Sequence, residues 1–266
     1  MINYNFKNKT VLITAGSKGI GFSLAREFAI NGANVAICSR SISNLKKARL
    51  LIKQDHQNNK ILTLRYDLNN ATNTKVLFEK AEKYFNSKVD ILINNSGGPQ
   101  PKEVIKTTAK DWNGALNVNL KSSIFASILA VKGMKKKKWG RIINLTSSTA
   151  KEPAVNMCLS NVTRAGLTSF GKTLSLEVAK YGITVNTILT GGVLTDRLEN
   201  LIKLSIKNTN KNYKSVIKKI SNDVPVGRIA TPKEFIQLIL FLASENSSYI
   251  TGTAIPIDGG TSKSIF

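Results

Sequence analysis

One segment near the start of the chain constrains its fold more than any other. Residues 9–14 (KTVLIT) are a short apolar run that is typical of a buried strand. The run continues into AGSKGIG and then into FSLAREFAING, an amphipathic segment that predicts a helix ending at Gly32. Gly16, Gly19 and Gly21 let main-chain N–H groups approach a phosphate at the start of that helix, where the helix dipole favours an anion. Strand, glycine turn and helix in this order predict a dinucleotide-binding unit.

The alternation of strands and helices continues beyond the glycine turn. Apolar runs at 33–39, 60–65 and 89–93 predict three more strands, and the segments 41–58 and 71–85 predict the helices between them. Strands that alternate with helices form a parallel, doubly wound sheet, which binds ligands at the carboxyl ends of its strands.

Residues after the second and third strands bear on which dinucleotide is bound. An acidic residue at the end of the second strand would bind an adenosine ribose and favour NAD, but Ser39 and Arg40 stand there. Arg40 and Lys18, in the glycine turn, favour the 2′-phosphate of NADP over NAD, unless both are ordinary surface bases. Asp67, after the third strand, can accept from the adenine amino group or cap the helix 71–85.

Composition bounds the size of the fold and its partners. A chain of 266 residues, 42% of them hydrophobic, without repeat or linker, predicts one domain over residues 1–266. The 39 Lys and Arg residues exceed the 16 Asp and Glu residues, and the net charge of +23 either attracts acidic or phosphorylated partners or is spread over solvated helix faces. Because no basic motif interleaved with aromatic residues is present, nucleic acid is not an expected partner.

Several classes of protein are not favoured by the sequence. No apolar run reaches the roughly 18–20 residues of a membrane span, and the first residues lack the apolar core of a signal peptide. Two cysteines, Cys38 and Cys158, predict no disulfide framework, so we expect a cytoplasmic protein with no membrane partner. The single histidine, His56, excludes histidine-based triads and His-rich metal sites, and we expect no metal.

Motifs along nearly the whole chain carry a family resemblance. The matching stretches are TAGSKGIG at 14–21, NNSG at 94–97, Asn119, RIINLTS at 141–147, TGGVLT at 190–195, PVGR at 225–228, TPKE at 231–234 and ITGTAIPIDGG at 250–260. The chain resembles the short-chain dehydrogenase/reductase family, close to its 3-oxoacyl-(acyl carrier protein) reductase-like members. The resemblance implies a single Rossmann-like, doubly wound parallel sheet of about seven strands, with helices on both faces.

The resemblance also assigns roles to individual residues. It implies cofactor contacts from Thr14, Gly16, Ser17, Lys18, Gly19, Ile20, Gly21, Arg40, Asp67, Asn94, Arg164, Gly191 and Thr195. It implies that Ser147 hydrogen-bonds the substrate oxygen and that Asn119 holds a water of the proton relay. The catalytic tyrosine and lysine of the family are replaced here by Ser160 and Arg164, in the pattern LSNxxR, and Ala15 and Thr190 depart from the usual glycine and proline.

The replaced tyrosine and lysine change the expected chemistry at the catalytic positions. Ser160 is a weaker acid than a phenol and has a shorter side chain, whereas Arg164 keeps a positive charge that can bind the nicotinamide ribose. Loss of a positioned general acid typically costs about 10²–10⁴ in rate. Two hypotheses follow: a slowed NADP-dependent oxidoreductase acting on a carbonyl or alcohol, such as a 3-oxoacyl thioester, or a non-catalytic NADP-binding sensor or scaffold. Ser160 can also be only an early residue of the helix 157–180.

Residues 195–224 correspond to the variable substrate lid of the family. A basic stripe of Lys203, Lys207, Lys211, Lys214 and Lys218 runs along this segment. The stripe predicts either a solvated helix face or a docking surface for an acidic acyl carrier. Tyr213 lies on the same segment, and we expect it not to reach the pocket. The resemblance further implies a homo-oligomer, a tetramer, paired through helices at about 120–137 and 157–180.

Overall fold

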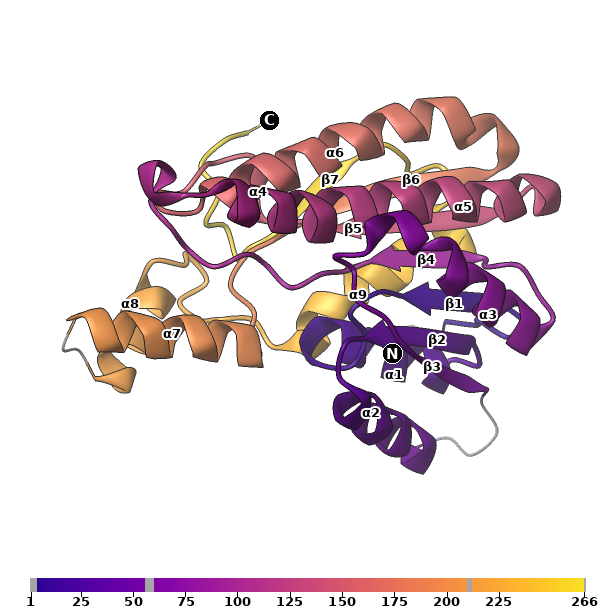
Figure 1. The fold of residues 1–266 in the computed structure, drawn as a ribbon, viewed down its shortest axis with the longest axis horizontal. Coiled ribbons are helices and arrows are strands. Elements are labelled where there is room, and N and C mark those ends of the chain that lie inside the picture. The colour runs from indigo at the N-terminus through magenta and orange to yellow at the C-terminus, as the bar shows by residue number, and fades with distance from the viewer. Residues whose placement is uncertain (1–3, 56–59, 210–211, 266) are drawn as a thin grey trace.

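A sheet of parallel strands forms the centre of the structure (Figure 1). The computed structural model describes residues 4–55, 60–209 and 212–265. Within them, seven strands lie in the order β3-β2-β1-β4-β5-β6-β7. They are β1 (Thr10–Ile13), β2 (Asn34–Ser39), β3 (Ile61–Arg65), β4 (Ile91–Asn94), β5 (Gly140–Leu145), β6 (Ile183–Thr190) and β7 (Ala254–Ile257). The strand order reverses at β1, between β2 and β4, which is where doubly wound sheets open a crevice for ligands.

Helices cover both faces of this sheet (Figure 1). One face packs against α1 (Gly19–Ile30), α2 (Ile42–Asp55) and α9 (Pro232–Ala243), and the other against α3 (Lys75–Phe85), α5 (Ser122–Lys137) and α6 (Cys158–Val178). Successive strand residues enter opposite cores: Val11 and Ile13 pack on the α1 side and Leu12 on the α5 side. The predicted fold class, a single Rossmann-like, doubly wound sheet, is confirmed.

Two predicted helices differ from the sequence-based ranges. The helix predicted at 41–58 is described as far as Asp55, and His56 lies outside the described residues. The helix predicted at 71–85 is divided into a 3₁₀ turn (Ala71–Asn73) and α3. Thr74 stands between the two, and its hydroxyl donates to the main-chain oxygen of Ala71.

One long helical stretch has the length and composition of a membrane span. It runs from Ala109 to Lys137 through α4 (Ala109–Leu116), a π-helical turn (Asn117–Lys121) and α5, and its most apolar window has a mean hydropathy of 1.3. Inside the protein α5 packs on α3, α6, β4 and β5. Its position is that of a core helix of the α/β layers.

The predicted lid forms a pair of helices beside the sheet. α7 (Asp196–Thr209) and α8 (Tyr213–Asn222) extend away from the layered body (Figure 1). The chain leading into α7 is held by main-chain hydrogen bonds between Ala230 and both Gly192 (3.1 Å) and Leu194 (2.8 Å). Lys203, Lys214 and Lys218 are exposed on the two helices; the Lys207 side chain and Lys211 lie outside the part that is described.

Candidate active site

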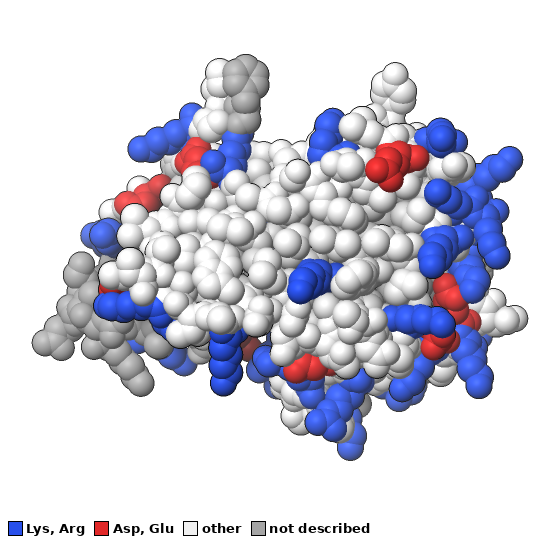
Figure 2. Space-filling model, turned by 45° about the horizontal axis from the view of Figure 1, so that its top comes forward, with Lys and Arg blue, Asp and Glu red and all other residues white. Residues whose placement is uncertain are grey.

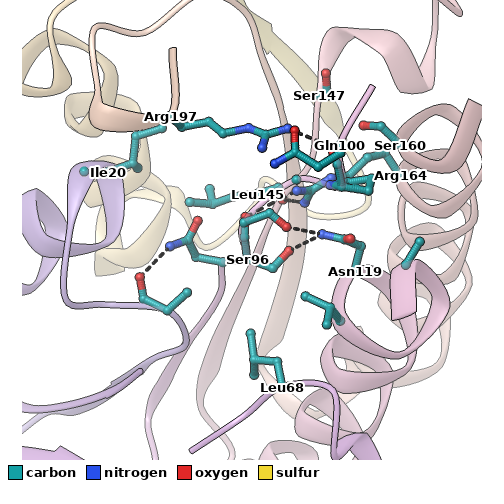
Figure 3. Close-up of a pocket in the computed structure, with 18 of the residues that line it drawn as sticks. Ile20, Leu68, Ser96, Gln100, Asn119, Leu145, Ser147, Ser160, Arg164 and Arg197 are labelled. Carbon is teal, nitrogen blue, oxygen red and sulfur yellow. Dashed lines mark hydrogen bonds between the residues drawn. The ribbon is translucent and has the colours of Figure 1, made fainter. Parts of the chain in front are cut away.

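A cleft opens at the carboxyl ends of β1, β4, β5 and β6 and is bordered by α7 (Figure 3). Its volume of about 1360 Å³ exceeds the roughly 300–1,000 Å³ of an ordinary small-molecule pocket, so it can accommodate two ligands together. The predicted site residues that line it are Ser17, Lys18, Gly19, Ile20, Arg40, Asp67, Asn119, Ser147, Ser160, Arg164, Gly191 and Thr195. The predicted nucleotide end and the predicted reacting end therefore belong to one cleft.

The glycine turn presents a helix N-terminus to this cleft. Ala15 and Gly19 both adopt left-handed backbone conformations, with φ of 47° and 53°. Ala15, which stands in place of the family's first glycine, therefore adopts the left-handed conformation of the turn, although that backbone conformation is unfavourable for residues with a Cβ. Lys18 precedes α1 without capping it through its side chain, and the first turn of α1 contains no acidic residue. The first N–H groups of α1 are therefore available to an anion such as a pyrophosphate.

Three predicted cofactor residues support the turn from behind the cleft wall. The Thr14 hydroxyl donates to the Asn95 main-chain oxygen (2.6 Å), and the Asn95 N–H donates back to the hydroxyl (2.9 Å). A Cβ at Gly21 would lie 2.6 Å from Nδ2 of Asn95, and one at Gly16 would lie 2.7 Å from a β2 side chain. These glycines are required by close packing of the turn on its neighbours.

Asn94 does not reach the cleft. Its amide is buried and donates to Oγ of Ser127 (2.9 Å) and Oδ1 of Asn144 (2.8 Å), joining β4 to α5 and β5. Its neighbour Asn95 lines the cleft and donates to the main-chain oxygen of Ala15 (3.1 Å). The structure thus disagrees with the predicted cofactor contact of Asn94 and offers Asn95 in its place.

The end of the cleft beside β2 carries the predicted NADP determinants. Arg40 is exposed and lines the cleft. Nζ of Lys18 lies 3.2 Å from Oδ2 of Asp196, so the glycine turn forms an exposed ion pair with the first residue of α7. The Asp67 carboxylate accepts from the N–H of Asn69 (2.9 Å). Asp67 therefore closes a local turn, and the alternative that it caps the helix 71–85 is wrong.

At the other end, Asn119 is fixed by two hydrogen bonds. Its Nδ2 donates to Oγ of Ser96 and to the main-chain oxygen of Gly97, both at 2.8 Å (Figure 3). Asn119 lies in the π-helical turn, a local widening that is frequent at functional sites. The buried Asn119 side chain thus ties the wide turn to the loop after β4.

Ser147 follows β5 and lines the cleft. Its Oγ accepts from the N–H of Thr149 (3.2 Å) and from the Thr149 hydroxyl (3.1 Å). A hydroxyl has two acceptor sites and one proton, so both acceptor sites of Ser147 are occupied and its proton remains to be donated.

No phenol replaces the missing tyrosine among the described residues that line the cleft near Ser147. Ser160, the third residue of α6, is buried and lines the cleft. Among the described lining residues the one tyrosine is Tyr66, which is distant in sequence from Ser147 and Ser160. Its hydroxyl donates to the main-chain oxygen of Asn70, and burial raises its pKa. Tyr213 does not line the cleft, as expected.

Arg164 projects from α6 into the reacting end. Its Nη1 donates to the main-chain oxygen of Leu145 (2.6 Å) and its Nη2 to that of Ser96 (3.3 Å). Burial lowers the pKa of the Arg164 guanidinium to about 10, and the positive charge of Arg197 contributes to the shift. Arg164 therefore remains protonated at neutral pH.

Arg197, the second residue of α7, is a site residue that sequence reasoning missed. Its Nη2 donates to the main-chain oxygen of Pro99 (2.7 Å), and burial lowers its pKa. Gly98 leaves room for it, since a Cβ there would lie 3.0 Å from Nη2 of Arg197. The sequence signal that could have identified Arg197 is its position two residues after Thr195, at the start of the predicted lid. The many other basic residues in that segment made Arg197 hard to distinguish.

The remaining cleft residues close the side next to β6. Gly191 packs so tightly that a Cβ would lie 2.5 Å from Cα of Asp258, and the Thr195 hydroxyl donates to the main-chain oxygen of Val193 (3.3 Å). Within the described residues, no group of three His, Cys, Asp or Glu side chains is placed to hold a metal ion.

Comparison with protein families gives one match over most of the chain. Residues 14–262 match the family described as enoyl-(acyl carrier protein) reductase. Among curated relatives, the NADPH-dependent reductase BacG of Bacillus subtilis is 30% identical over 97% of this chain and 99% of its own length. The 3-oxoacyl-(acyl carrier protein) reductase FabG of Chlamydia trachomatis is 33% identical over 95% of this chain and 97% of its own length.

Solved structures show the same fold. The crystal structure of YwfH, an NADPH-dependent reductase involved in bacilysin biosynthesis, is 31% identical, with a TM-score of 0.91 over 97% of this chain and 99% of that one. The L-sorbose reductase of Gluconobacter frateurii, solved with NADPH and L-sorbose, is 28% identical, with a TM-score of 0.93 over 99% of this chain and 100% of that one.

Proposed function

This chain belongs to the short-chain dehydrogenase/reductase family, and we propose that it is an NADP(H)-dependent oxidoreductase that transfers hydride between the cofactor and the carbonyl or alcohol of a small molecule. The observation that carries the proposal is that the open N-terminus of α1 shares one cleft with Ser147, Asn119 and Arg164. NADPH supplies the hydride when it is bound. BacG, YwfH and L-sorbose reductase are NADPH-dependent or NADPH-bound relatives, which supports the cofactor assignment.

The residues around the glycine turn fit a phosphorylated dinucleotide. The pyrophosphate would accept from the first N–H groups of α1, next to Gly19 and Ile20. Arg40 would bind the 2′-phosphate, because no acidic residue follows β2 and Arg40 is exposed at the cleft. Lys18 would add its charge after exchanging its partner Asp196 for the phosphate.

At the reacting end, the proposed roles of the side chains differ from those in a site that contains the catalytic tyrosine. Ser147 would donate a hydrogen bond to the substrate oxygen, without transferring its proton, since both its acceptor sites are used by Thr149. Arg164 would donate one of its remaining N–H groups to the nicotinamide ribose and supply a fixed positive charge. Asn119 would hold a water at the π-helical turn. The proton for the substrate oxygen would then come from water, and the reaction would be slower by about 10²–10⁴ than with a positioned acid.

Paired measurements test this function. We expect NADPH fluorescence to change on binding, and a panel of activated ketones to show slow oxidation of NADPH. Ser147→Ala should remove most of the turnover and leave NADPH binding in place. Ser148→Ala is the matched control, because Ser148 is adjacent and does not line the cleft. Failure of NADPH to bind would contradict the proposal.

A second candidate is a non-catalytic NADP-binding sensor or scaffold. The observation that favours it is Ser160, which leaves the reacting end without a phenol among the described lining residues. Tight NADPH binding without turnover on any ketone or alcohol of the panel would favour this candidate over the enzyme.

We further propose a cytoplasmic homo-oligomer, a tetramer. Figure 2 shows a broad face with few charged residues, over the helices at the top of Figure 1, and Lys and Arg gathered mainly toward its edges. Large apolar side chains are exposed on these helices: Ile128 on α5, and Val162 and Leu176 on α6. Such a face is suited to burial against another copy. Light scattering that gives only the monomer mass at micromolar protein would refute the tetramer.

An acidic acyl carrier is a candidate form of substrate delivery. The exposed Lys203, Lys214 and Lys218 lie on the lid helices and would attract such a carrier. Replacing all three by Gln should weaken turnover of a carrier-bound 3-oxoacyl thioester at low salt, and have no effect on a free thioester of the same acyl group. Equal effects on both would contradict carrier docking.

A further inference from the structure

Two arginines meet in the cleft without a carboxylate partner. Arg164 enters from α6 and Arg197 from the start of α7, and Figure 3 shows their side chains converging beside Gln100. Among the described residues, neither arginine forms an ion pair. By contrast, Lys102, which also lines the cleft, is paired with Asp111 at 2.6 Å.

The hydrogen bonds of the two guanidinium groups are incomplete. Each guanidinium carries five N–H donors. Arg164 uses two of its N–H groups on main-chain oxygens and Arg197 uses one, and all three acceptors are neutral. Partly buried positive charges with only neutral acceptors are costly, and an anion between them offsets both the burial and the mutual repulsion.

The hydrogen bonds to main-chain oxygens also fix the positions of the two guanidinium groups. The Leu145 oxygen holds Arg164 at the end of β5, and the Pro99 oxygen holds Arg197 over the loop after β4. Both groups line the same cleft as Ser147, which is the second residue after β5 and has a hydroxyl proton free to donate. Planar guanidinium forks held in place in this way suit the two oxygens of a carboxylate.

We propose that Arg197, together with Arg164, binds the carboxylate of the substrate, and that the substrate is a small oxo acid or the corresponding hydroxy acid. This inference rests on the proposed function, because it names the substrate class of the same cleft. In the proposed function the cofactor's phosphates would lie elsewhere, at the N-terminus of α1 and at Arg40, both of which border the cleft. An anion bound between the two arginines would therefore belong to the substrate.

A carboxylate site at Arg164 and Arg197 favours a free oxo acid over a carrier-bound thioester as the substrate. A thioester is neutral at its reacting end, and the phosphate of a carrier lies at the far end of a long arm. A carrier-bound thioester would therefore leave Arg164 and Arg197 without a negative charge between them, beside the substrate carbonyl. A free oxo acid brings its own negative charge to that place.

The test compares acids with their neutral esters. The probes are 2-oxobutanoate, 3-oxobutanoate and 4-oxopentanoate, each beside its methyl ester, with kcat/KM measured at saturating NADPH. We expect at least one acid to exceed its ester by about tenfold to a hundredfold, the range for a lost hydrogen bond to a charged group. Arg197→Gln should bring this ratio toward one, and Arg197→Lys should retain part of it. Lys219→Gln removes one exposed charge from α8, the other helix of the pair, and should leave the ratio as it is.

A binding measurement makes the result independent of turnover. The preferred oxo acid is titrated by calorimetry into protein saturated with NADP⁺, which cannot reduce it, and NADPH binding is followed separately by fluorescence. Weaker acid binding by Arg197→Gln, with NADPH affinity retained, supports the inference. Normal NADPH binding with no preference for any acid would overturn it and leave the proposed function standing. Loss of NADPH affinity in Arg197→Gln with acid binding unchanged would also overturn it, since Arg197 would then serve the cofactor. If the wild type binds no NADPH, the proposed function itself fails.

Discussion

Nη1 of Arg164 lies 2.6 Å from the main-chain oxygen of Leu145, so the guanidinium from α6 is fastened to the last residue of β5. A lysine at this position has one ammonium group, whereas the planar fork can hold the strand with one nitrogen and direct others into the cleft. The replacement of the family's lysine therefore gives a rigid cation whose position depends on β5 and on the loop containing Ser96.

Arg164→Ala should weaken the binding of NADPH by about tenfold to a hundredfold, because a hydrogen bond from a charged group to the ribose is lost. The free energy of unfolding should also fall by about 2 kcal/mol, since the oxygens of Leu145 and Ser96 lose their donor. Fluorescence titration and urea unfolding measure the two effects. Lys172→Ala, an exposed change on the same helix, is the control, and an unchanged affinity for NADPH in Arg164→Ala would refute the ribose contact.

Arg40 should determine the preference for NADPH over NADH. Removing its charge by Arg40→Ala should lower NADPH affinity by about tenfold or more and leave NADH affinity nearly unchanged, because only NADPH has the 2′-phosphate. Titration of both cofactors against wild type, Arg40→Ala and the exposed control Lys47→Ala measures this. Equal affinities for the two cofactors in the wild type would remove the assignment of Arg40.

Particular residues show what the sequence could and could not predict. Residues of the glycine turn, Asn119 and Ser147 line one cleft, at the end of the sheet that strand periodicity and the family motifs predicted for them. Asn94 was misplaced, since β4 extends one residue beyond its predicted end at 93. Alternation along the strand then directs Asn94 toward α5 and leaves Asn95 for the cleft.

Arg197 illustrates a different limit of sequence reasoning. Its importance depends on a contact with Pro99, 98 residues away in the chain, and on the absence of an ion pair to Arg197 among the described residues, since the adjacent Asp196 pairs with Lys18. In a chain with 39 Lys and Arg residues, only three-dimensional placement distinguishes a partly buried, unpaired arginine from the solvated ones.

Glu234, in the capping box at the start of α9, should make the stability of the protein depend on pH. It accepts from Arg228 and from the N–H and hydroxyl of Thr231, and the Arg228 contact is the largest cause that lowers its pKa to about 2. A carboxyl whose pKa is lower in the folded state stabilises above its unfolded pKa, and this contribution is lost as pH falls through the folded value. Glu234→Gln should therefore lower the thermal midpoint at pH 7, and the difference from wild type should shrink between about pH 4.5 and pH 2. A difference in thermal midpoint that is constant over this pH range would show that the charge of Glu234 does not contribute to the stability of the fold.

The last prediction concerns Ser160, which occupies the place of the family's phenol. Ser160→Ala should change turnover by less than about threefold, because an aliphatic hydroxyl is too weak an acid to deliver the proton and Ser147 already donates to the substrate oxygen. Ser160→Tyr with Arg164→Lys restores an acid and a neighbouring ammonium that lowers its pKa, and this double variant should raise the reduction of an activated ketone by about tenfold or more. The single variant Ser160→Tyr separates the effect of the ring from that of the lysine, and NADPH titration shows whether the cofactor still binds. Stopped-flow measurement of NADPH oxidation at several pH values gives the comparison. A wild type that is already fast, and is disabled by Ser160→Ala, would show that Ser160 itself carries the proton transfer.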